Sequence, residues 1–529
     1  MPDIQSKSGS PSQPKSPPSL KAPELEPGLE TWLRAGAGGQ GRCERLVETS
    51  ISWVFLYRDR VLKLKKPVDF GFVDFTTPAK RRWAAERELQ FNRATAPDIY
   101  RAVHAVVRRP NGGFALGGEG EVIDWALEMR RFDETEVLSE QPQVVHGAFA
   151  ETLGRQIAQV HAAAPLGAKG GGSEGIEEVI RSNSRQLRGL PQGIDQAMVE
   201  RVLAATELAL QSVAGLLDER LRLGLVRRCH GDLHLGNILL ENGRAVLFDC
   251  VEFNDALNEI DVLYDLAFLL MDLGFCGQAE GANRVLNGWC DEAALAFGDE
   301  PWRGLAALPL FQAVRATVRA HVCGHAADVD GATRHLAAAE GHLRPVGPGL
   351  AAVGGLSGSG KTTFARALAP MIAPTPGAVV LRSDEIRKRL WGRSPTDALP
   401  PEAYTADASA SVYDAMIHAA RTCLSAGWPV VLDASFLEAR QRSRAEALAV
   451  DLRCRFEAVW LEAPADVLKA RVAERSGDAS DADLRVLQGQ LTRDPGPIRW
   501  RRLKAVDLEG GVQATAKRLS ESSEASPPA

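Results

Sequence analysis

Two separate segments of the chain combine residue types that can bind phosphate, ligate a hard cation and accept a proton. In the first, Asp232 follows His230-Gly231, Asn237 lies five residues later, and Asp249 ends a short apolar run. The spacing is like H-R-D-x-x-x-x-N, in which one loop presents a carboxylate to a hydroxyl and an amide oxygen to a metal. Carboxylate and amide oxygens are ligands that Mg²⁺ accepts. The sequence therefore predicts Asp232 as a catalytic base, and Asn237 and Asp249 as metal ligands.

The second segment has the spacing of a phosphate-binding loop. Residues 355–362 read Gly-Leu-Ser-Gly-Ser-Gly-Lys-Thr, which fits G-x-x-x-x-G-K-[ST]. An apolar run at 350–354 precedes it as a strand, and residues 363–368 open a helix, which is the context that the motif requires. We expect Lys361 to reach the ATP phosphates and to act in catalysis, and the Thr362 hydroxyl to bind Mg²⁺. The nucleotide-binding residues predicted here are Gly355, Leu356, Ser357, Gly358, Ser359, Gly360, Lys361, Thr362 and Thr363.

Two carboxylates follow later apolar runs of this second segment. Asp384 comes after residues 378–381, and Asp433 ends residues 428–433. Strands that alternate with helices imply a parallel sheet with ligands at the carboxyl ends of its strands. We expect Asp384 to accept the proton of a substrate hydroxyl and Asp433 to support Mg²⁺, with helix N-capping as the alternative for both.

Arg471 and Arg475 lie four residues apart, so a helix places them on one face. The run resembles the mobile lid of small P-loop kinases, whose arginines close over the transferring phosphoryl group. The alternative is an ordinary solvated helix face.

Lysines also occur on a predicted strand near the N-terminus. Residues 51–57 and 61–65 are predicted strands, and alternation places Lys63 and Lys65 on one face of the second. Residues 78–93 form a predicted helix that carries Glu86 and Glu88. One lysine could contact ATP phosphates and pair with a glutamate, for which we favour Glu88. A solvated edge strand beside a salt-bridged surface helix is the alternative.

Residues 230–237, followed by Phe248-Asp249 and by residues 261–268, resemble the aminoglycoside phosphotransferase and choline kinase-like superfamily. The resemblance covers about residues 45–345 and implies a two-lobed, protein-kinase-like fold. It also implies an adenine-facing hinge at 124–130. The roles carried over are base for Asp232, metal ligands for Asn237 and Asp249, and ATP-binding residues for Lys63 or Lys65 with Glu88. Residues 49–52 contain no glycine, so the Gly-rich loop of protein kinases is missing.

The remainder, about residues 346–519, resembles the P-loop kinase group that includes gluconate kinase, polynucleotide kinase and zeta toxin, often labelled AAA-type ATPases. Residues 382–387 are similar to the acceptor-binding run of its 5′-hydroxyl kinases. The order of the two modules is similar to bacterial proteins that fuse an aminoglycoside phosphotransferase domain to an ATP-binding kinase domain. The resemblance implies ATP and Mg²⁺ as cofactors and names no acceptor.

The bulk composition is that of a multidomain globular chain. At 529 residues and a net charge of −6, it has no global basic field that would draw nucleic acid or an anionic membrane. The eight cysteines are scattered without a C-x-x-C pair, which favours reduced cytosolic thiols. No apolar run is long enough to span a bilayer. A cytoplasmic location without membrane association is therefore expected, and nucleic acid is an unlikely partner.

The predicted fold class is multidomain α/β and α+β. The predicted segments are a disordered tail at 1–27, a kinase-like domain at 28–345, a P-loop domain with a three-layer parallel sheet at 346–519, and a second tail at 520–529. Within the kinase-like domain, the small lobe covers about 45–125 and the large lobe about 130–345. The oligomeric state is left open.

The function predicted from these features is a bifunctional ATP-dependent phosphotransferase acting on hydroxyl groups of small molecules, with one site per domain. One alternative is an ATP-binding regulatory protein with one inactive module. The other is a 5′-hydroxyl polynucleotide kinase-like activity in the C-terminal domain, suggested by the basic residues at 382–389.

Overall fold

The computed structural model describes residues 24–520 except 40, 72, 168, 191–192, 346, 475–478 and 506. The chain divides into two compact units, residues 1–132 and 133–529. Most of the predicted tails at 1–27 and 520–529 lies outside the described residues. Among the described helices, none is both long and apolar enough to cross a membrane.

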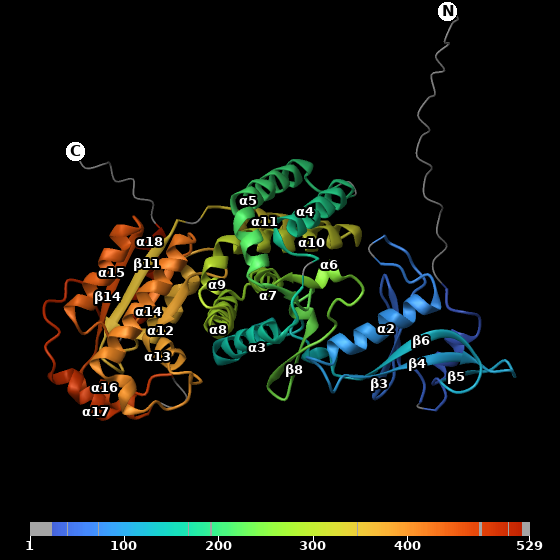
Figure 1. The fold of residues 1–529 in the computed structure, drawn as a ribbon, viewed down its shortest axis with the longest axis horizontal. Helices are drawn as coiled ribbons and strands as arrows, with labels where there is room; N and C mark the ends of the chain where they lie inside the picture. The colour runs from blue at the N-terminus through green and yellow to red at the C-terminus, as the bar shows by residue number, and fades with distance from the viewer. Residues whose placement is uncertain are drawn as a thin grey trace, which may run out of the picture. The chain divides into compact units, whose positions relative to one another are not determined.

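The first unit is an antiparallel sheet with two helices (Figure 1). The strand order is β1-β2-β3-β6-β4-β5. The strands are β1 (Arg45–Glu48), β2 (Ser52–Leu56), β3 (Arg60–Lys65), β4 (Tyr100–Arg108), β5 (Phe114–Leu116) and β6 (Glu121–Arg130). The helices are α1 (Leu29–Arg34) and α2 (Pro78–Asn92).

Alternation along β3 directs its side chains to the two helices. Leu62 and Leu64 share an apolar cluster with Leu29 and Leu33 of α1. The intervening lysines pair with α2, which packs on β4 and β6. Thr77 caps α2 by accepting the Lys80 N–H, and Pro78 occupies the first turn, where its missing N–H is not needed.

The segment at 124–130, predicted as a hinge, is instead part of β6, hydrogen-bonded to β3 on one side and to β4 on the other. The apolar pair and triplet in 121–130, at 122–123 and 125–127, suit a strand inside a sheet, and the unit boundary falls after this strand, between Phe132 and Asp133.

The second unit begins with a helical region around two short antiparallel sheets of two strands each. Its helices are α3 (Gly147–Ala163), α4 (Gly172–Arg188), α5 (Gln196–Arg222), α6 (Asp255–Asn258), α7 (Val262–Phe275), α8 (Ala279–Phe297), α9 (Glu300–Arg303), α10 (Leu308–His325) and α11 (Val329–His342). Its strands are β7 (Val226–Arg228), β8 (Ile238–Glu241), β9 (Arg244–Leu247) and β10 (Glu259–Asp261). Strands β7 and β8 flank the loop at 229–237, and the almost wholly buried helix α7 packs against α8 and α10.

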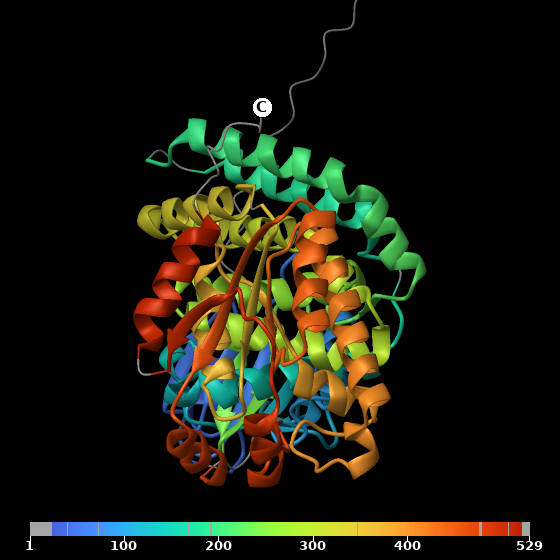
Figure 2. The same ribbon diagram turned by 90° about the vertical axis from the view of Figure 1, so that its left-hand side faces the viewer.

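The unit continues with a five-stranded parallel sheet in the order β12-β13-β11-β14-β15. The strands are β11 (Gly349–Gly355), β12 (Val379–Arg382), β13 (Val430–Asp433), β14 (Arg455–Glu462) and β15 (Arg501–Lys504). The helices are α12 (Lys361–Leu368), α13 (Ser383–Leu390), α14 (Ala406–Ser425), α15 (Ala439–Asp451), α16 (Ala465–Ala473), α17 (Leu484–Thr492) and α18 (Leu508–Ser520). Figure 2 shows α18 on one side of this sheet and α14 on the other. The predicted three-layer parallel-sheet arrangement is confirmed.

The apolar core of the second unit runs from the helical region into the sheet. One cluster of buried residues contains Leu153 of α3 and Trp289 of α8 together with Val379 of β12 and Val430 of β13. This shared core explains why residues 133–345 and 349–520 belong to one compact unit.

Candidate active sites

In the first unit, two lysines share one carboxylate. Lys63 Nζ lies 2.8 Å from Glu88 Oε1, and Lys65 Nζ lies 2.6 Å from Glu88 Oε2. Burial of Glu88 raises its pKa, but the two ammonium groups outweigh burial and lower it to about 2. Glu86 points away and pairs with the exposed Arg82. The structure thus places both candidate lysines on Glu88.

The missing Gly-rich loop is replaced by a turn that a threonine closes. The Thr49 N–H donates to Ser52 O at 2.9 Å, and Thr49 Oγ1 accepts the Ser52 N–H at 2.9 Å. A hydroxyl can in this way stabilise a tight turn between β1 and β2 without glycine.

The loop between β7 and β8 brings its predicted base and metal ligand together. Asn237 Nδ2 donates to Asp232 Oδ2 at 3.0 Å and to Asp232 O at 2.9 Å. Since the amide nitrogen is directed at Asp232, its oxygen is the atom suited to a cation. Asp249 follows β9 in a left-handed conformation (φ 58°), and the preceding carbonyl, Phe248 O, accepts from His230 Nε2 at 2.8 Å. His230 therefore ties the loop to the segment that carries Asp249.

The environment keeps the Asp232 side chain ionised. Burial raises its pKa, but the hydrogen bond with His234 and the positive charge of Arg315 outweigh burial and lower it to about 2. Burial lowers the pKa of His230. A neutral His230 suits its role as donor to a carbonyl oxygen.

The loop backbone is held by a buried carboxylate from α7. Asp265 is fully buried; its Oδ1 accepts the Gly231 N–H at 2.8 Å and its Oδ2 the His230 N–H at 3.1 Å. His161 Nε2 lies 3.1 Å from Asp265, while Trp289 Nε1 donates to His161 Nδ1 at 3.1 Å. His161 therefore carries its proton on Nε2 and donates it to Asp265.

Cys229 lies close enough to His161 and Asp265 for the three to hold a metal ion. These hydrogen bonds already use both histidine nitrogens and both carboxylate oxygens, so the cluster is explained as a support for the loop.

Sequence reasoning missed the support that Arg315 gives this loop. Its guanidinium donates to Gly231 O at 3.1 Å and stacks on Tyr264, 3.8 Å from the ring centroid. Arg315 lies on α10, about 80 residues beyond the loop, and belongs to no local motif. Its contact with the loop is therefore visible only in the tertiary structure.

The second site is built at the carboxyl ends of β11, β12 and β13. Thr362 Oγ1 donates to Asp433 Oδ2 at 2.6 Å, and Lys361 Nζ donates to Leu356 O at 2.9 Å. Gly358 has φ 82°, and a Cβ there would lie 2.8 Å from Leu468 O, so the loop needs glycine at this position. A threonine hydroxyl beside a carboxylate is a donor set that suits Mg²⁺.

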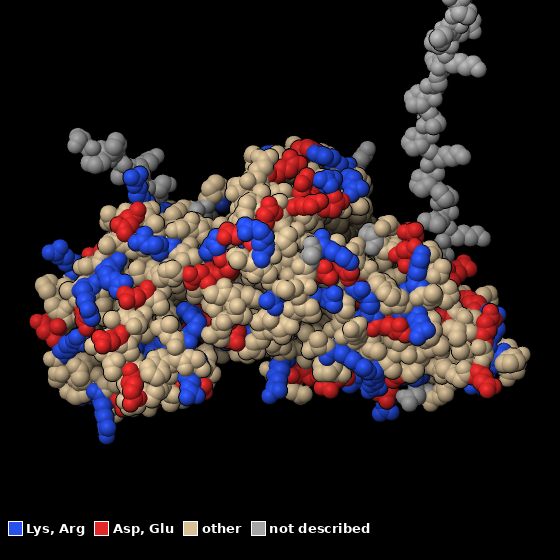
Figure 3. All heavy atoms as spheres, in the orientation of Figure 1, with Lys and Arg blue, Asp and Glu red and all other residues tan. Residues whose placement is uncertain are grey.

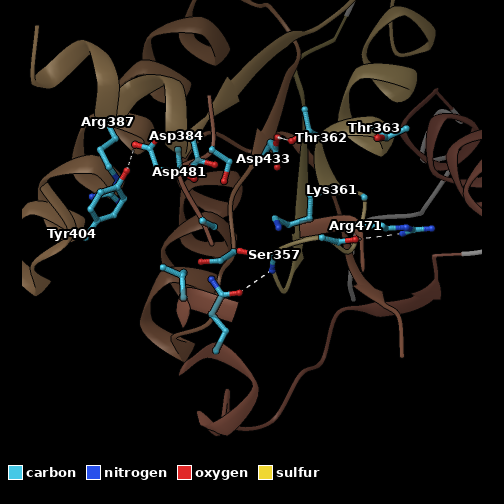
Figure 4. A pocket seen from close by; sticks show the side chains of 18 of the residues that line it. Ser357, Lys361, Thr362, Thr363, Asp384, Arg387, Tyr404, Asp433, Arg471 and Asp481 are labelled. Carbon is cyan, nitrogen blue, oxygen red and sulfur yellow. Dashed lines mark hydrogen bonds between the residues drawn. The ribbon is translucent and has the colours of Figure 1, made fainter. Parts of the chain in front are cut away.

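These groups line a cavity of about 510 Å³ (Figure 4). Lys361, Thr362, Asp433 and Asp384 come together in it, and Thr363, Ser357, Gly358 and Gly360 also line it. Burial raises the pKa of Asp384. The positive charge of Arg382 acts in the opposite direction, but the pKa remains above its usual value. The cavity therefore holds the P-loop, two neighbouring oxygen groups of a kind that suits Mg²⁺, and a carboxylate with increased affinity for a proton. Gly355 and Ser359 are buried within the loop, and Leu356 contributes its carbonyl oxygen.

The helices α16 and α17 cover the phosphate-binding loop. Arg471 Nη1 donates to Gly358 O at 3.4 Å, and Gln490 Oε1 accepts the Ser357 N–H at 2.8 Å. Arg475, the second predicted lid arginine, lies outside the described residues. Gln490 was not predicted, because glutamine on a separate helix carries no motif.

Two family models match the chain, each over one of these sites. Residues 70–305 match the phosphotransferase enzyme family, and residues 350–495 match the AAA domain. With the sites described above, these matches define an ATP-dependent kinase with two kinase-type domains. The predicted fusion of an aminoglycoside phosphotransferase-like domain with a P-loop kinase domain is confirmed.

The chain belongs to the same family as the uncharacterized proteins Rv2004c of Mycobacterium tuberculosis and Mb2027c of Mycobacterium bovis. Each is 31% identical over 463 residues, which is 84% of this chain and 89% of the relative.

Solved structures also align with each half. A thermostable mutant of aminoglycoside phosphotransferase APH(4)-Ia aligns with 60% of this chain and 98% of its own, at 14% identity and a TM-score of 0.38. A gluconokinase from Sinorhizobium meliloti 1021 aligns with 33% of this chain and 93% of its own, at 25% identity and a TM-score of 0.24. These structures differ too much from this chain to indicate its acceptors.

Proposed function

We propose that the protein is a bifunctional phosphotransferase that moves the γ-phosphate of ATP to hydroxyl groups of small molecules at two independent sites. The main support for this proposal is that Lys361, Thr362, Asp433 and Asp384 line the same cavity. Kinases require a phosphate contact, a metal site and a group that accepts the hydroxyl proton.

At the P-loop site, the acceptor hydroxyl oxygen would attack the γ-phosphorus while its proton passes to an Asp384 oxygen. The bond from the γ-phosphorus to the bridging oxygen breaks, and ADP leaves. Lys361 and the loop N–H groups bind the phosphates, and Thr362 and Asp433 would hold Mg²⁺. The bound cation would neutralise charge on the β- and γ-phosphate oxygens. Arg471, already on the phosphate-binding loop at Gly358 O, is suited to the transferring phosphoryl group, with Arg475 as a further lid cation.

At the first site, Asp232 would accept the hydroxyl proton, and Asn237 and Asp249 would hold Mg²⁺. The hydrogen bonds from Asn237 orient Asp232, and its lowered pKa keeps it ionised. Lys63 and Lys65, oriented by Glu88, are the groups in the first unit suited to ATP phosphates.

Small acceptors are favoured over nucleic acid at the P-loop site because the basic residues that suggested nucleic acid have internal partners. Arg382 donates to Glu385 at 2.6 Å, Lys388 pairs with Asp481 at 2.6 Å, and Arg389 pairs with Asp291 at 3.2 Å. Figure 3 shows both signs of charge interspersed over the face drawn. A nucleic acid ligand would show binding that weakens steeply with salt, so a flat salt response would support the small acceptor.

The test is Mg²⁺-dependent ATP consumption in a pool of cytosolic metabolites by the native chain, Asp232→Asn, Lys361→Ala and the double variant. We expect kinase-like turnover of about 1–100 s⁻¹, lost in part by each single variant and wholly by the double variant. Turnover abolished by one single variant alone would assign all chemistry to that site and refute two independent activities. ATP binding without turnover by the native chain would favour the regulatory alternative.

A further inference from the structure

Helix α8 of the kinase-like domain covers an edge of the P-loop sheet. Strand β12 is the terminal strand of that sheet, so one of its edges has no neighbouring strand. On that edge, the Val380 N–H donates to Asn287 Oδ1 at 2.7 Å, and Asn283 Nδ2 donates to Ala378 O at 2.9 Å. Because a buried peptide group without a partner is costly, these two amides fix β12 against α8.

A third residue on the same face of α8, Asp291, contacts α13, the helix that follows β12. Asn283, Asn287 and Asp291 follow one another at four-residue spacing, which places them on one helix face. Asp291 Oδ1 accepts from Arg389 Nη1 of α13 at 3.2 Å. Burial and the charge of Glu385 raise the pKa of Asp291 well above its usual range, whereas the surrounding arginines lower that of Glu385 despite its burial. Asp291 and Glu385 therefore lie in one buried cluster of charged groups, with Arg155 3.8 Å from the former and 3.9 Å from the latter.

Glu385 connects this contact to the metal-binding pair. Its Oε1 accepts from Arg382 Nη1 at 2.6 Å. Arg382 in turn lies 3.3 Å from Asp433 Oδ2 through Nε, and its Nη2 lies 3.4 Å from Thr362 Oγ1. Asp384, the proposed base, lies between Arg382 and Glu385 in the sequence. The orientation of Arg382 thus depends on Glu385 of α13, the helix that Asp291 of α8 anchors through Arg389.

Helix α8 is itself held firmly by α3. A Cβ on Gly288 would lie 2.3 Å from Glu151 O, and a Cβ on Gly154 would lie 2.1 Å from Val285 O, so the two backbones are in close contact. Glu151 also accepts from Arg366 of the P-loop domain at 2.7 Å. The two helices lie side by side and pack closely against each other (Figure 1).

We propose that Asn283, Asn287 and Asp291 are positioning residues for phosphotransfer at the P-loop site, supplied by the other kinase-type domain. They act by placing β12 and α13, which carry Arg382, Asp384 and Glu385. The inference rests on the proposed activity of the P-loop site.

The test uses the full chain with Asp232→Asn, so that Mg²⁺-dependent ATP consumption in the metabolite pool belongs to the P-loop site. Adding Asn283→Ala with Asn287→Ala should lower kcat about 10- to 100-fold, as expected for a small misplacement of reacting groups. The KM for ATP should change less, because the phosphate-binding loop is untouched. Asp299→Asn is the matched control, because Asp299 pairs with His418 at 2.6 Å between the same two domains and both side chains are exposed. This control should retain the parent kcat.

Two substitutions of Asp291 distinguish a role of its polar contact in positioning α13 from a role of its side-chain volume in packing. Asp291→Ala should lower kcat, while Asp291→Asn should retain most of it, because the amide oxygen can still accept from Arg389. Equal losses in these two variants would overturn the proposal.

Folding is checked with the same α8 changes in a Lys361→Ala background, where turnover that depends on Asp232 should be retained. A folded Asn283→Ala, Asn287→Ala variant with the parent kcat would also overturn the proposal. If that variant fails to fold, the comparison of Asp291→Ala with Asp291→Asn decides. If the Asp232→Asn parent itself shows no turnover that Lys361→Ala removes, the proposed function of the P-loop site fails, and this inference fails with it.

Discussion

Replacing Glu88 by Gln should destabilise the first unit far more than the same change at Glu86. Glu88→Gln keeps the shape of the side chain but leaves two lysines without their shared countercharge. The Lys63 and Lys65 side chains are only 14% and 4% exposed, so water cannot replace the carboxylate. Glu86 is half exposed and pairs with the half-exposed Arg82, so Glu86→Gln is the matched control on the same helix.

The magnitude follows from the pKa of Glu88. It lies at about 2 in the folded chain, against an ordinary 4.5. That difference corresponds to about 3 kcal/mol of stability at neutral pH, which agrees with the ~3–5 kcal/mol measured when buried ion pairs are broken. An exposed pair such as Glu86 with Arg82 contributes about 0.3–0.5 kcal/mol. Because the folded pKa is the lower one, the Glu88 contribution is complete above about pH 4.5 and is lost as pH falls toward 2.

Hydrogen exchange of the β3 and α2 amides at neutral pH measures this loss where it occurs. Exchange that requires opening of this region should accelerate about 100-fold in Glu88→Gln and less than about threefold in Glu86→Gln. Similar exchange in the two variants would refute the view that Glu88 neutralises both lysines of β3.

Three further outcomes are expected. As the pH falls, the P-loop activity should be lost at a higher pH than the activity of the first site, because the pKa of Asp384 is raised and that of Asp232 is lowered to about 2. Separate pH–rate profiles of the two singly inactivated variants check this. Loss of both activities at the same acidic pH would contradict it. Asp265→Asn should lower turnover at the first site about 100-fold and spare the P-loop site, because an amide has one oxygen where the carboxylate uses two to accept the loop N–H groups. An unchanged kcat at the first site would count against a role of Asp265 in positioning this loop. Thr362→Val should raise the Mg²⁺ concentration needed for half-maximal P-loop turnover, since it removes the hydroxyl that meets Asp433 at 2.6 Å; a Mg²⁺ titration identical to that of the native chain would exclude Thr362 from the metal site.

The local parts of both sites could be predicted because short-range geometry determines them. A phosphate-binding loop needs glycines, lysine and threonine at fixed offsets between a strand and a helix, and residues 355–363 lie in that setting. Alternation placed both lysines of β3 on one face, where Glu88 meets them. The open choices between Lys63 and Lys65, and between Glu86 and Glu88, required the packing of α2 on the sheet.

The positioning groups could not be predicted because they come from distant parts of the chain. Arg315 reaches the loop at Gly231 from 84 residues away, and Asn283 reaches β12 at Ala378 from 95 residues away. No spacing rule connects such pairs, since the fold alone brings them within hydrogen-bonding distance.

The sequence by itself determined which chemistry each module could support, because residue types and short spacings identify a phosphate-binding loop and predict a base and metal ligands. It did not determine that the helical part of the kinase-like domain and the P-loop domain share one apolar core. Only the tertiary structure decided this, since burial and the pairing of an edge strand depend on which surfaces meet after folding.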